Sequence, residues 1–234
     1  MNANPLAIQL EAAVDRAREM DVSLGERLDY VARAVRSLST EFADGVDRLI
    51  DRLRAADAGA DAPQVGDAMP TFALPDVAGN FVRLEEELEK GPVAVIFNRG
   101  HWCPYCRLNT DALAVAQRRL GKASEILAIT PERSRFSSQM MSDAHADFPV
   151  LTDLDNGYAM SLNLAFWVGD EMRNLMTAAG YLPSPGQGND AWFLPIPATF
   201  VVRTDGKVKA RFIDPDYRKR MAIGDLVDAL RAPD

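Results

Sequence analysis

The two cysteines of this chain, Cys103 and Cys106, are separated by only two residues in a sequence of 234. The apolar run Val93–Phe97 precedes them and is typical of a buried strand, and the pattern of Cys106–Leu120 predicts a helix. A strand that ends at a short cysteine loop and continues into a helix favours an α/β fold. The pair therefore indicates where the chemistry of the chain lies.

The junction places Cys103 at the N-terminus of the predicted helix. Backbone N–H groups and the positive end of the helix dipole point at this position, and they lower a thiol pKa from about 8.5 to roughly 3.5–7.5. We therefore predict that Cys103 is the nucleophile. Cys106, one turn further on, is predicted to resolve a mixed disulfide or sulfenic acid formed on Cys103. Pro104 fits the first helical turn, where no N–H donor is needed.

Other chemistries explain the cysteine pair less well. A zinc site could use His101, Cys103 and Cys106 with His145 as a distant fourth ligand, but structural zinc favours four firm ligands in two spaced pairs. Haem attachment requires a histidine directly after the second cysteine, where this chain has Arg107. A structural disulfide would close too short a loop to stabilise the fold much. We therefore expect neither a metal nor another cofactor.

The composition narrows the partners. The formal net charge of −8 argues against nucleic acid, because affinity for its backbone depends on Lys and Arg. No apolar run approaches the roughly 18 residues of a membrane span, and no basic and apolar leader opens the chain. These features predict a cytoplasmic protein that binds neither nucleic acid nor membrane. In that reducing compartment, two cysteines are better explained as reactive thiols than as a structural framework.

Residues 1–60 are predicted to form an N-terminal helical extension. An earlier helix is expected around Leu6–Met20, and Ser23 with Glu26 has the pattern of a capping box for a second, long helix. Its apolar residues recur at spacings of three and four and form one stripe: Leu24, Leu28, Val31, Val35, Leu38, Phe42, Val46, Leu49 and Leu53. The stripe fits a helical hairpin for self-association, as in a homodimer, and it fits a cover on the same domain equally well.

Residues 63–234 are predicted to form the α/β domain, after a linker at 55–64 that is rich in Ala, Asp and Gly. Strands alternate with helices and the domain ends in a hairpin, which favours a mixed sheet covered on both faces. The predicted elements are a strand at Glu125–Thr130, a helix at Phe136–Ala146, a hairpin of Ala198–Val202 and Val208–Ile213, and a helix at Ile223–Leu230.

An insertion at about residues 164–195 interrupts this alternation. It contains a Pro- and Gly-rich turn region at 183–188 and a group of large apolar side chains: Phe166, Trp167, Met172, Met176, Tyr181, Trp192 and Phe193. These side chains fit a lid or an interface near the cysteines. A second patch of core explains most of them slightly better.

Four segments resemble the peroxiredoxin-like family, which includes alkyl-hydroperoxide-reductase-like and redoxin domains. They are residues 65–76 (VGDAMPTFALPD), 97–107 (FNRGHWCPYCR), 148–153 (FPVLTD) and 214–217 (DPDY). The second segment is similar to the signature of the subgroup that carries a thioredoxin-type Cys-x-x-Cys. The resemblance covers roughly residues 63–232, and its most specific part is residues 102–106.

The resemblance implies a thioredoxin fold and a thiol–disulfide oxidoreductase or antioxidant activity. Cys103 would attack a hydroperoxide or a disulfide, Cys106 would resolve it, and an external dithiol of the thioredoxin or glutathione type would restore the pair. Trp102, Arg99 and Pro197 would position the substrate. In that fold the bond that matches Ile196–Pro197 is cis and lies beside the cysteines.

The chain departs from typical peroxiredoxins in the peroxide pocket. Those proteins carry Pro and then Thr or Ser at seven and three residues before the reactive cysteine, where this chain has Ile96 and Gly100. The hydroxyl that orients the peroxide is therefore missing, whereas an arginine could come from Arg99, Arg203 or Arg211. An alternative function is a redox-sensing or interaction module that the Cys103–Cys106 disulfide switches without turnover.

Overall fold

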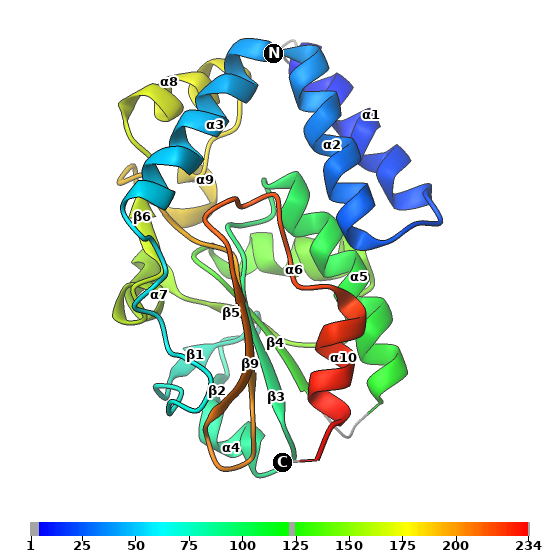
Figure 1. Cartoon of the computed structure of the whole chain (residues 1–234), viewed down its shortest axis with the longest axis vertical. Helices are drawn as coiled ribbons and strands as arrows, with labels where there is room; N and C mark the ends of the chain where they lie inside the picture. The colour runs from blue at the N-terminus through cyan, green and yellow to red at the C-terminus, as the bar shows by residue number, and fades with distance from the viewer. Residues whose placement is uncertain (1–4, 122–124, 234) are drawn as a thin grey trace.

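A central sheet of five strands forms the core of the protein in the computed structural model, which describes residues 5–121 and 125–233. The strand order is β5-β4-β3-β8-β9 (Figure 1). The strands β3 (Val93–Phe97), β4 (Glu125–Thr130) and β5 (Val150–Thr152) run parallel, and β8 (Ala198–Val202) and β9 (Val208–Ile213) complete the sheet in antiparallel pairings. The predicted mixed sheet of a thioredoxin-like α/β fold is therefore confirmed.

The side chains of β3 show why the sheet is covered on both faces. Successive residues of a strand point to opposite faces, and all five residues of β3 are buried. Ala94 and Ile96 pack with apolar residues of α5 (Pro104–Leu120) and α10 (Ile223–Arg231). Val93, Val95 and Phe97 pack with the apolar cluster of the opposite face. The continuous apolar pattern of the strand follows from this double burial.

The remaining elements surround this sheet. The helix α6 (Ser134–Ala144) packs beside α5 and β5, and it ends two residues before the predicted boundary because His145 adopts a left-handed conformation at its C-terminus. The shorter elements are β1 (Ala73–Pro75), β2 (Phe81–Arg83), α4 (Leu84–Leu88), η1 (Leu154–Asn156), α7 (Gly157–Ser161), β6 (Ala165–Trp167), α9 (Ser184–Gln187) and β7 (Phe193–Pro195).

Three helices, rather than the predicted two, form the N-terminal region: α1 (Pro5–Glu19), α2 (Leu24–Leu38) and α3 (Thr40–Ala55). The expected single long helix breaks at Ser39, whose extended backbone caps both neighbours: its N–H donates to Val35, and its hydroxyl accepts from the amide of Phe42. The predicted capping box of Ser23 and Glu26 is present. Residues 1–4 of the predicted extension and residue 234 of the predicted domain lie outside the described residues.

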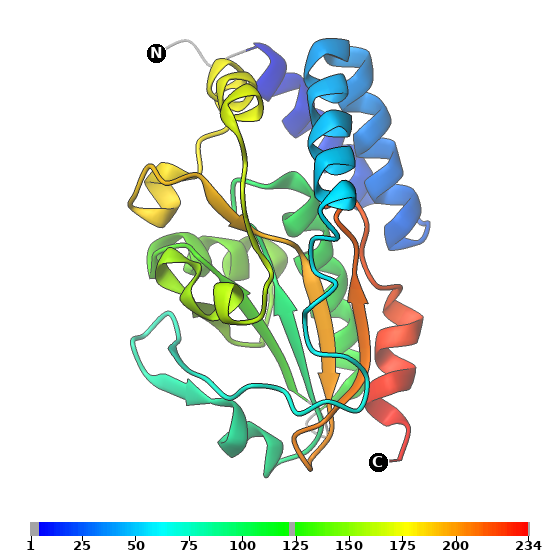
Figure 2. The same cartoon turned by 60° about the vertical axis from the view of Figure 1, so that its left-hand side comes forward.

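The N-terminal helices pack on the rest of the chain. Helices α1 and α2 contact α5, and α3 contacts α8 (Asp170–Ala179) (Figures 1 and 2). Ion pairs join the two parts: Arg18 to Asp111 at 2.8 Å, Arg107 to Glu11 at 2.7 Å and Arg218 to Asp47 at 2.9 Å. The apolar stripe therefore covers a surface of the same chain, as one of the two interpretations proposed.

The insertion folds as a small hairpin that carries two helices. Strand β6 pairs with β7, and α8 and α9 lie between them in the sequence. Phe166, Met172, Met176 and Trp192 are buried, whereas the paired Trp167 and Phe193 are largely exposed. Most of the aromatic and methionine side chains are thus core. Among the described helices, none is long and apolar enough to cross a membrane.

Candidate active site around Cys103 and Cys106

The cysteine motif lies where the sequence predicts it, between the end of β3 and the start of α5. Cys103 is the N-cap of α5, and its carbonyl accepts hydrogen bonds from the amides of Cys106 and Arg107 at 3.1 Å each. Pro104 occupies the first helical position. Both thiols are free, and both are buried: 1% of Cys103 and none of Cys106 is exposed. The predicted nucleophile is therefore almost completely buried.

Positive and polar donors converge on Cys106. The amide of Arg99 donates to its sulfur at 3.3 Å, and the Arg220 guanidinium donates at 3.4 Å. Burial opposes ionisation of this thiol, but the hydrogen bond from Cys103, the charge of Arg220 and the Arg99 amide together lower its pKa to about 5. The reduced pair is therefore set up to hold one thiolate.

The same contacts raise the pKa of Cys103. Burial is the main cause, and the hydrogen bond that Cys103 donates to Cys106 and the negative charge of that neighbour add to the rise. The expectation that the helix N-terminus lowers the pKa of Cys103 is therefore wrong for the reduced pair. The covering helices remove Cys103 from water, and the donors at the junction face Cys106 instead.

Arg99 and Trp102, two of the predicted positioning residues, lie beside Cys103. The Arg99 guanidinium carbon is 4.8 Å from the Trp102 ring centroid and 3.9 Å from that of Tyr217, so the cation is held between two aromatic faces. Arg99 is only 3% exposed, and no carboxylate pairs with it within residues 5–121 and 125–233. It is thus a buried cation next to the cysteines.

The other two arginine candidates are occupied elsewhere. Arg203 pairs with Asp205 at the β8–β9 turn, and Arg211 donates to the carbonyls of Ala62 and Pro63 in the predicted linker. Arg99 is therefore the candidate that reaches the site. Arg107, considered from the sequence as a source of positive potential, pairs with Glu11.

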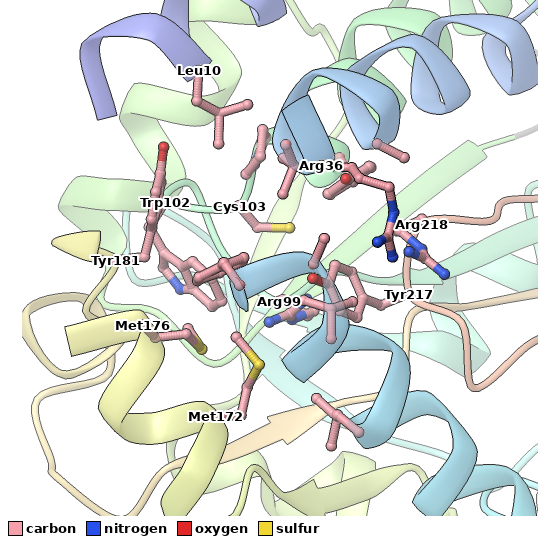
Figure 3. A pocket seen from close by; sticks show the side chains of 18 residues that line it. Leu10, Arg36, Arg99, Trp102, Cys103, Met172, Met176, Tyr181, Tyr217 and Arg218 are labelled. Atoms are coloured by element: carbon pink, nitrogen blue, oxygen red, sulfur yellow. The ribbon is translucent and has the colours of Figure 1, made fainter. Parts of the chain in front are cut away.

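A narrow cavity, partly open to solvent, lies next to Cys103. Figure 3 shows the Cys103 sulfur pointing into it, with Leu10 of α1 on one side and Arg99 and Tyr217 on the other. Its walls come from the N-terminal helices and from α8, and Met172, Met176 and Tyr181 of the insertion take part. Cys106 does not line it. The insertion is therefore core for most of its apolar side chains and part of the site for these three.

Glu132 occupies the space that a side chain at position 100 would need. Gly100 has a φ of +135°, and a Cβ built on it would lie 2.6 Å from the Glu132 carboxyl carbon. Burial raises the pKa of this carboxyl to about 7, and the nearby Cys106 thiolate adds to the rise, although the His101 amide donates to it at 2.6 Å. The missing side chain at position 100 is thus replaced by a buried acid from the loop after β4.

Pro197, the third predicted positioning residue, is buried one residue before β8, where Thr199 pairs with Ile96 of β3. It does not line the cavity. The Ile196–Pro197 bond is trans, and residues 5–121 and 125–233 contain no cis peptide bond, so the expected cis bond is wrong. The Ile196 amide donates to Leu164 at 2.7 Å, which carries the β6–β7 hairpin directly into the sheet in an extended path.

The residues weighed for zinc lie apart. The His101 ring is 2.8 Å from Asp143, whereas His145 ends α6. Across the described ranges, no group of three or more His, Cys, Asp or Glu side chains is arranged to hold a metal ion.

Sequence reasoning missed Arg220, Glu132 and the contribution of the N-terminal helices. Glu132 could have been found, because it follows a strand parallel to β3, and the carboxyl ends of parallel strands meet at the same edge of a sheet. Arg220 follows the recognised segment 214–217, but no pattern connects it with Cys106.

Comparisons with known proteins identify the family and the fold of the chain. A family model described as Redoxin matches residues 64–230, which include all five strands of the central sheet and exclude α1–α3. The solved structure of the peroxidoxin BcpB from Mycobacterium tuberculosis is similar with a TM-score of 0.54 and 20% identity, over 72% of this chain and 97% of that one. A peroxiredoxin-like protein from Aquifex aeolicus has a TM-score of 0.52 and 14% identity, over 73% and 87%. At these identities the likeness shows the fold. No curated protein matches the chain.

Proposed function

The chain belongs to the Redoxin family of thiol oxidoreductases, and from this membership we propose that Cys103 attacks a hydroperoxide or disulfide substrate and that Cys106 resolves the product. One observation carries the proposal. The two thiols are hydrogen-bonded to each other, Arg220 stabilises Cys106 as a thiolate, and Cys103 is the one of the two cysteines that lines the cavity. A substrate that enters the cavity meets Cys103 first.

Attack by Cys103 needs its proton to move. In the reduced pair, the Cys103 S–H donates to the Cys106 sulfur. Transfer along this existing hydrogen bond places the thiolate on Cys103 and the proton on Cys106, and the neighbouring Arg99 charge favours the anion. Cys103 is therefore the attacking thiol because the substrate can reach it through the cavity, although Cys106 has the lower pKa and ionises first.

With a hydroperoxide, the Cys103 thiolate attacks the terminal oxygen and the O–O bond breaks. Cys103 becomes a sulfenic acid, and the alkoxide leaves as an alcohol after taking up the proton that had moved to Cys106, which leaves Cys106 as the thiolate. The Cys106 thiolate then attacks the Cys103 sulfur, forms the S–S bond and releases hydroxide, which is protonated to water. The two thiols have then lost two electrons to the hydroperoxide.

With a disulfide, the Cys103 thiolate displaces one thiolate and forms a mixed disulfide. The displaced thiolate takes the proton from Cys106, and the resulting Cys106 thiolate displaces the second thiolate. Both routes end in the same Cys103–Cys106 disulfide. An external thiol reductant, either a dithiol of the thioredoxin type or two molecules of glutathione, returns two electrons and two protons to the pair and is itself oxidised to a disulfide.

Glu132 is suited to handle a proton in these steps. Its carboxyl has a pKa of about 7 and interacts with the charge of Cys106, so it changes protonation state near neutral pH. We assign it as a positioning residue that acts through Cys106. In the reduced pair the neutral acid is favoured, and loss of the thiolate on oxidation makes its ionisation easier.

The test follows oxidation of the reduced protein by stopped flow, using Trp102 fluorescence, after mixing with hydrogen peroxide or with a model disulfide. We expect rapid oxidation by at least one of them and complete loss of turnover in Cys103→Ser. Peroxide oxidation no faster than that of a free small-molecule thiol would remove the peroxidase reaction and leave disulfide exchange. A Cys103→Ser variant that keeps its activity would show that the nucleophile is wrong.

The second candidate is the redox-sensing module, which the closed position of Cys103 under α1–α3 favours. In that case one oxidation of the pair would change the surface of the chain without repeated turnover. A steady-state assay with excess dithiol distinguishes the two, because only an enzyme consumes many equivalents of oxidant.

A further inference from the structure

The cavity beside Cys103 has walls that are mostly apolar. Helices α2 and α3 contribute Ala32, Val35, Phe42 and Val46, and α8 contributes Met172 and Met176. Narrow apolar clefts with a few polar groups are typical of small-molecule sites. This lining fits an alkyl chain or a flat ring and offers few hydrogen bonds to a peptide.

The charged side chains that line the cavity are all positive. Its lining includes Arg36, Arg99 and Arg218 and contains no Asp or Glu among the described residues, in a chain with a net charge of −8. Arg36 and Arg218 are balanced from outside the cavity by Asp47 and by further carboxylates. Arg99 remains without a carboxylate partner in residues 5–121 and 125–233.

Arg99 is the least satisfied of these cations. It is 97% buried, and its Nε lacks a hydrogen-bond partner within the described part of the chain. The Cys106 thiolate supplies one negative charge nearby, but Arg220 already donates to it. Two guanidinium groups therefore face one anion. The rings of Trp102 and Tyr217 stabilise the Arg99 cation in part, and Tyr217 also hydrogen-bonds to it, but no second anion offsets its charge, so a ligand that supplies one would bind favourably.

We propose that this cavity binds a small amphipathic anion, with an alkyl or aryl body between α2, α3 and α8 and a carboxylate-like head at Arg99, beside Cys103. The proposal names the class of substrate that reaches the site, and in that respect it rests on the proposed function. A folded protein, whether a disulfide substrate or a thioredoxin-type reductant, would have to displace part of α1–α3 or α8 before it reached Cys103, whereas a small molecule enters through the cavity.

The experiment measures binding by titration calorimetry with three ten-carbon probes: decanoate, decanol and decylamine. The Cys103→Ser variant is used, so that no thiol chemistry contributes to the heat. We expect decanoate to bind at least about tenfold more tightly than decylamine, because charged hydrogen bonds at Arg99 contribute roughly 1.5–3 kcal/mol. Acetate, which lacks the apolar body, should show no binding at the same concentrations.

Substitutions test the position of the head. In Arg99→Met, decanoate should bind roughly 10–100-fold more weakly, whereas decanol should change less than about threefold. The matched control is Arg173→Met, which removes an arginine on α8 that pairs with Asp170 and does not line the cavity. In the wild-type protein, decanoate should slow alkylation of Cys103 by iodoacetamide, which places the ligand at this cysteine.

The results separate this inference from the proposed function. Equal affinity for decanoate and decylamine, or unchanged decanoate binding in Arg99→Met, would overturn the inference even if the enzyme turns over. Decanoate binding that protects Cys103, in a protein that neither hydroperoxides nor disulfides oxidise, would support the site and refute the proposed reaction.

Discussion

Replacement of Glu132 by glutamine converts a buried acid into a neutral side chain of the same shape. Glu132 is 1% exposed, and within residues 5–121 and 125–233 the His101 amide is its only hydrogen-bond donor. Glutamine keeps an oxygen that accepts this hydrogen bond but does not ionise. The substitution therefore isolates the free energy of placing a negative charge between Gly100 and Gly186, the two glycines against which the carboxyl packs.

The magnitude follows from the shift in the pKa of this carboxyl, from 4.5 to about 7. Between these values the folded state holds a proton that the unfolded state has lost. The stabilising contribution of Glu132 is therefore complete below pH 4.5 and is lost as the pH rises through 7. A shift of about 2.5 pKa units at 1.36 kcal/mol each gives a loss of about 3 kcal/mol.

The assay is urea unfolding under reducing conditions at several pH values from 5 to 8.5, for wild type and Glu132→Gln. Relative to wild type, Glu132→Gln should become more stable by about 2.5 kcal/mol from pH 5 to 8.5, and most of this change should occur between pH 5 and 7. The difference should be smaller in a Cys106→Ser background, because the thiolate that adds to the shift is absent. A difference between the two proteins that is constant with pH would refute the assignment of a raised pKa.

The remaining predictions concern the cysteine pair and its loop. Arg220→Met should raise the pKa of Cys106 above about 5, seen as a later rise of thiolate absorbance at 240 nm, whereas Lys219→Met, which changes an exposed neighbour, should not. Gly100→Ser should destabilise the fold by about 1–3 kcal/mol in urea unfolding rather than restore a peroxide pocket, because Glu132 fills that space. Gly66→Ser is the control for backbone strain, since it also has a positive φ but no atoms within 4 Å of a built Cβ; an equal loss at both positions would show that crowding by Glu132 is not the cause. Iodoacetamide should label Cys103 before Cys106, which mass spectrometry of the digested protein checks.

Local signals were sufficient to predict four of the five strands of the central sheet, whereas β5 was not predicted as a strand. The strands β3, β4, β8 and β9 have the bounds that their apolar runs indicate, because β3, β4 and β8 are almost entirely buried and β9 is partly buried. The long stripe of residues 24–53 was misleading because both α2 and α3 turn their apolar sides toward the same domain. The spacing of three and four residues continues across Ser39, although the helix is interrupted there.

The site was predictable only where its residues are close in sequence. Cys103, Cys106, Arg99 and Trp102 lie within eight positions, and the family resemblance identifies them together. Glu132 and Arg220 join them through the fold, and the pKa values of the thiols depend on Arg220, on Arg99, on each other and on burial. The position of Cys103 at the N-terminus of a helix was therefore predicted correctly, but the direction of its pKa shift inferred from that position was wrong.

The hydrogen bond between the two thiols also has a consequence for chemical damage. A sulfenic acid on Cys103 would form with its resolving partner already in contact, under helices that restrict the entry of a second oxidant molecule. Ring closure would then compete well with further oxidation to sulfinic acid, which is irreversible for most proteins. A closed site of this kind reacts more slowly with its oxidant, but it loses fewer active cysteines to irreversible oxidation.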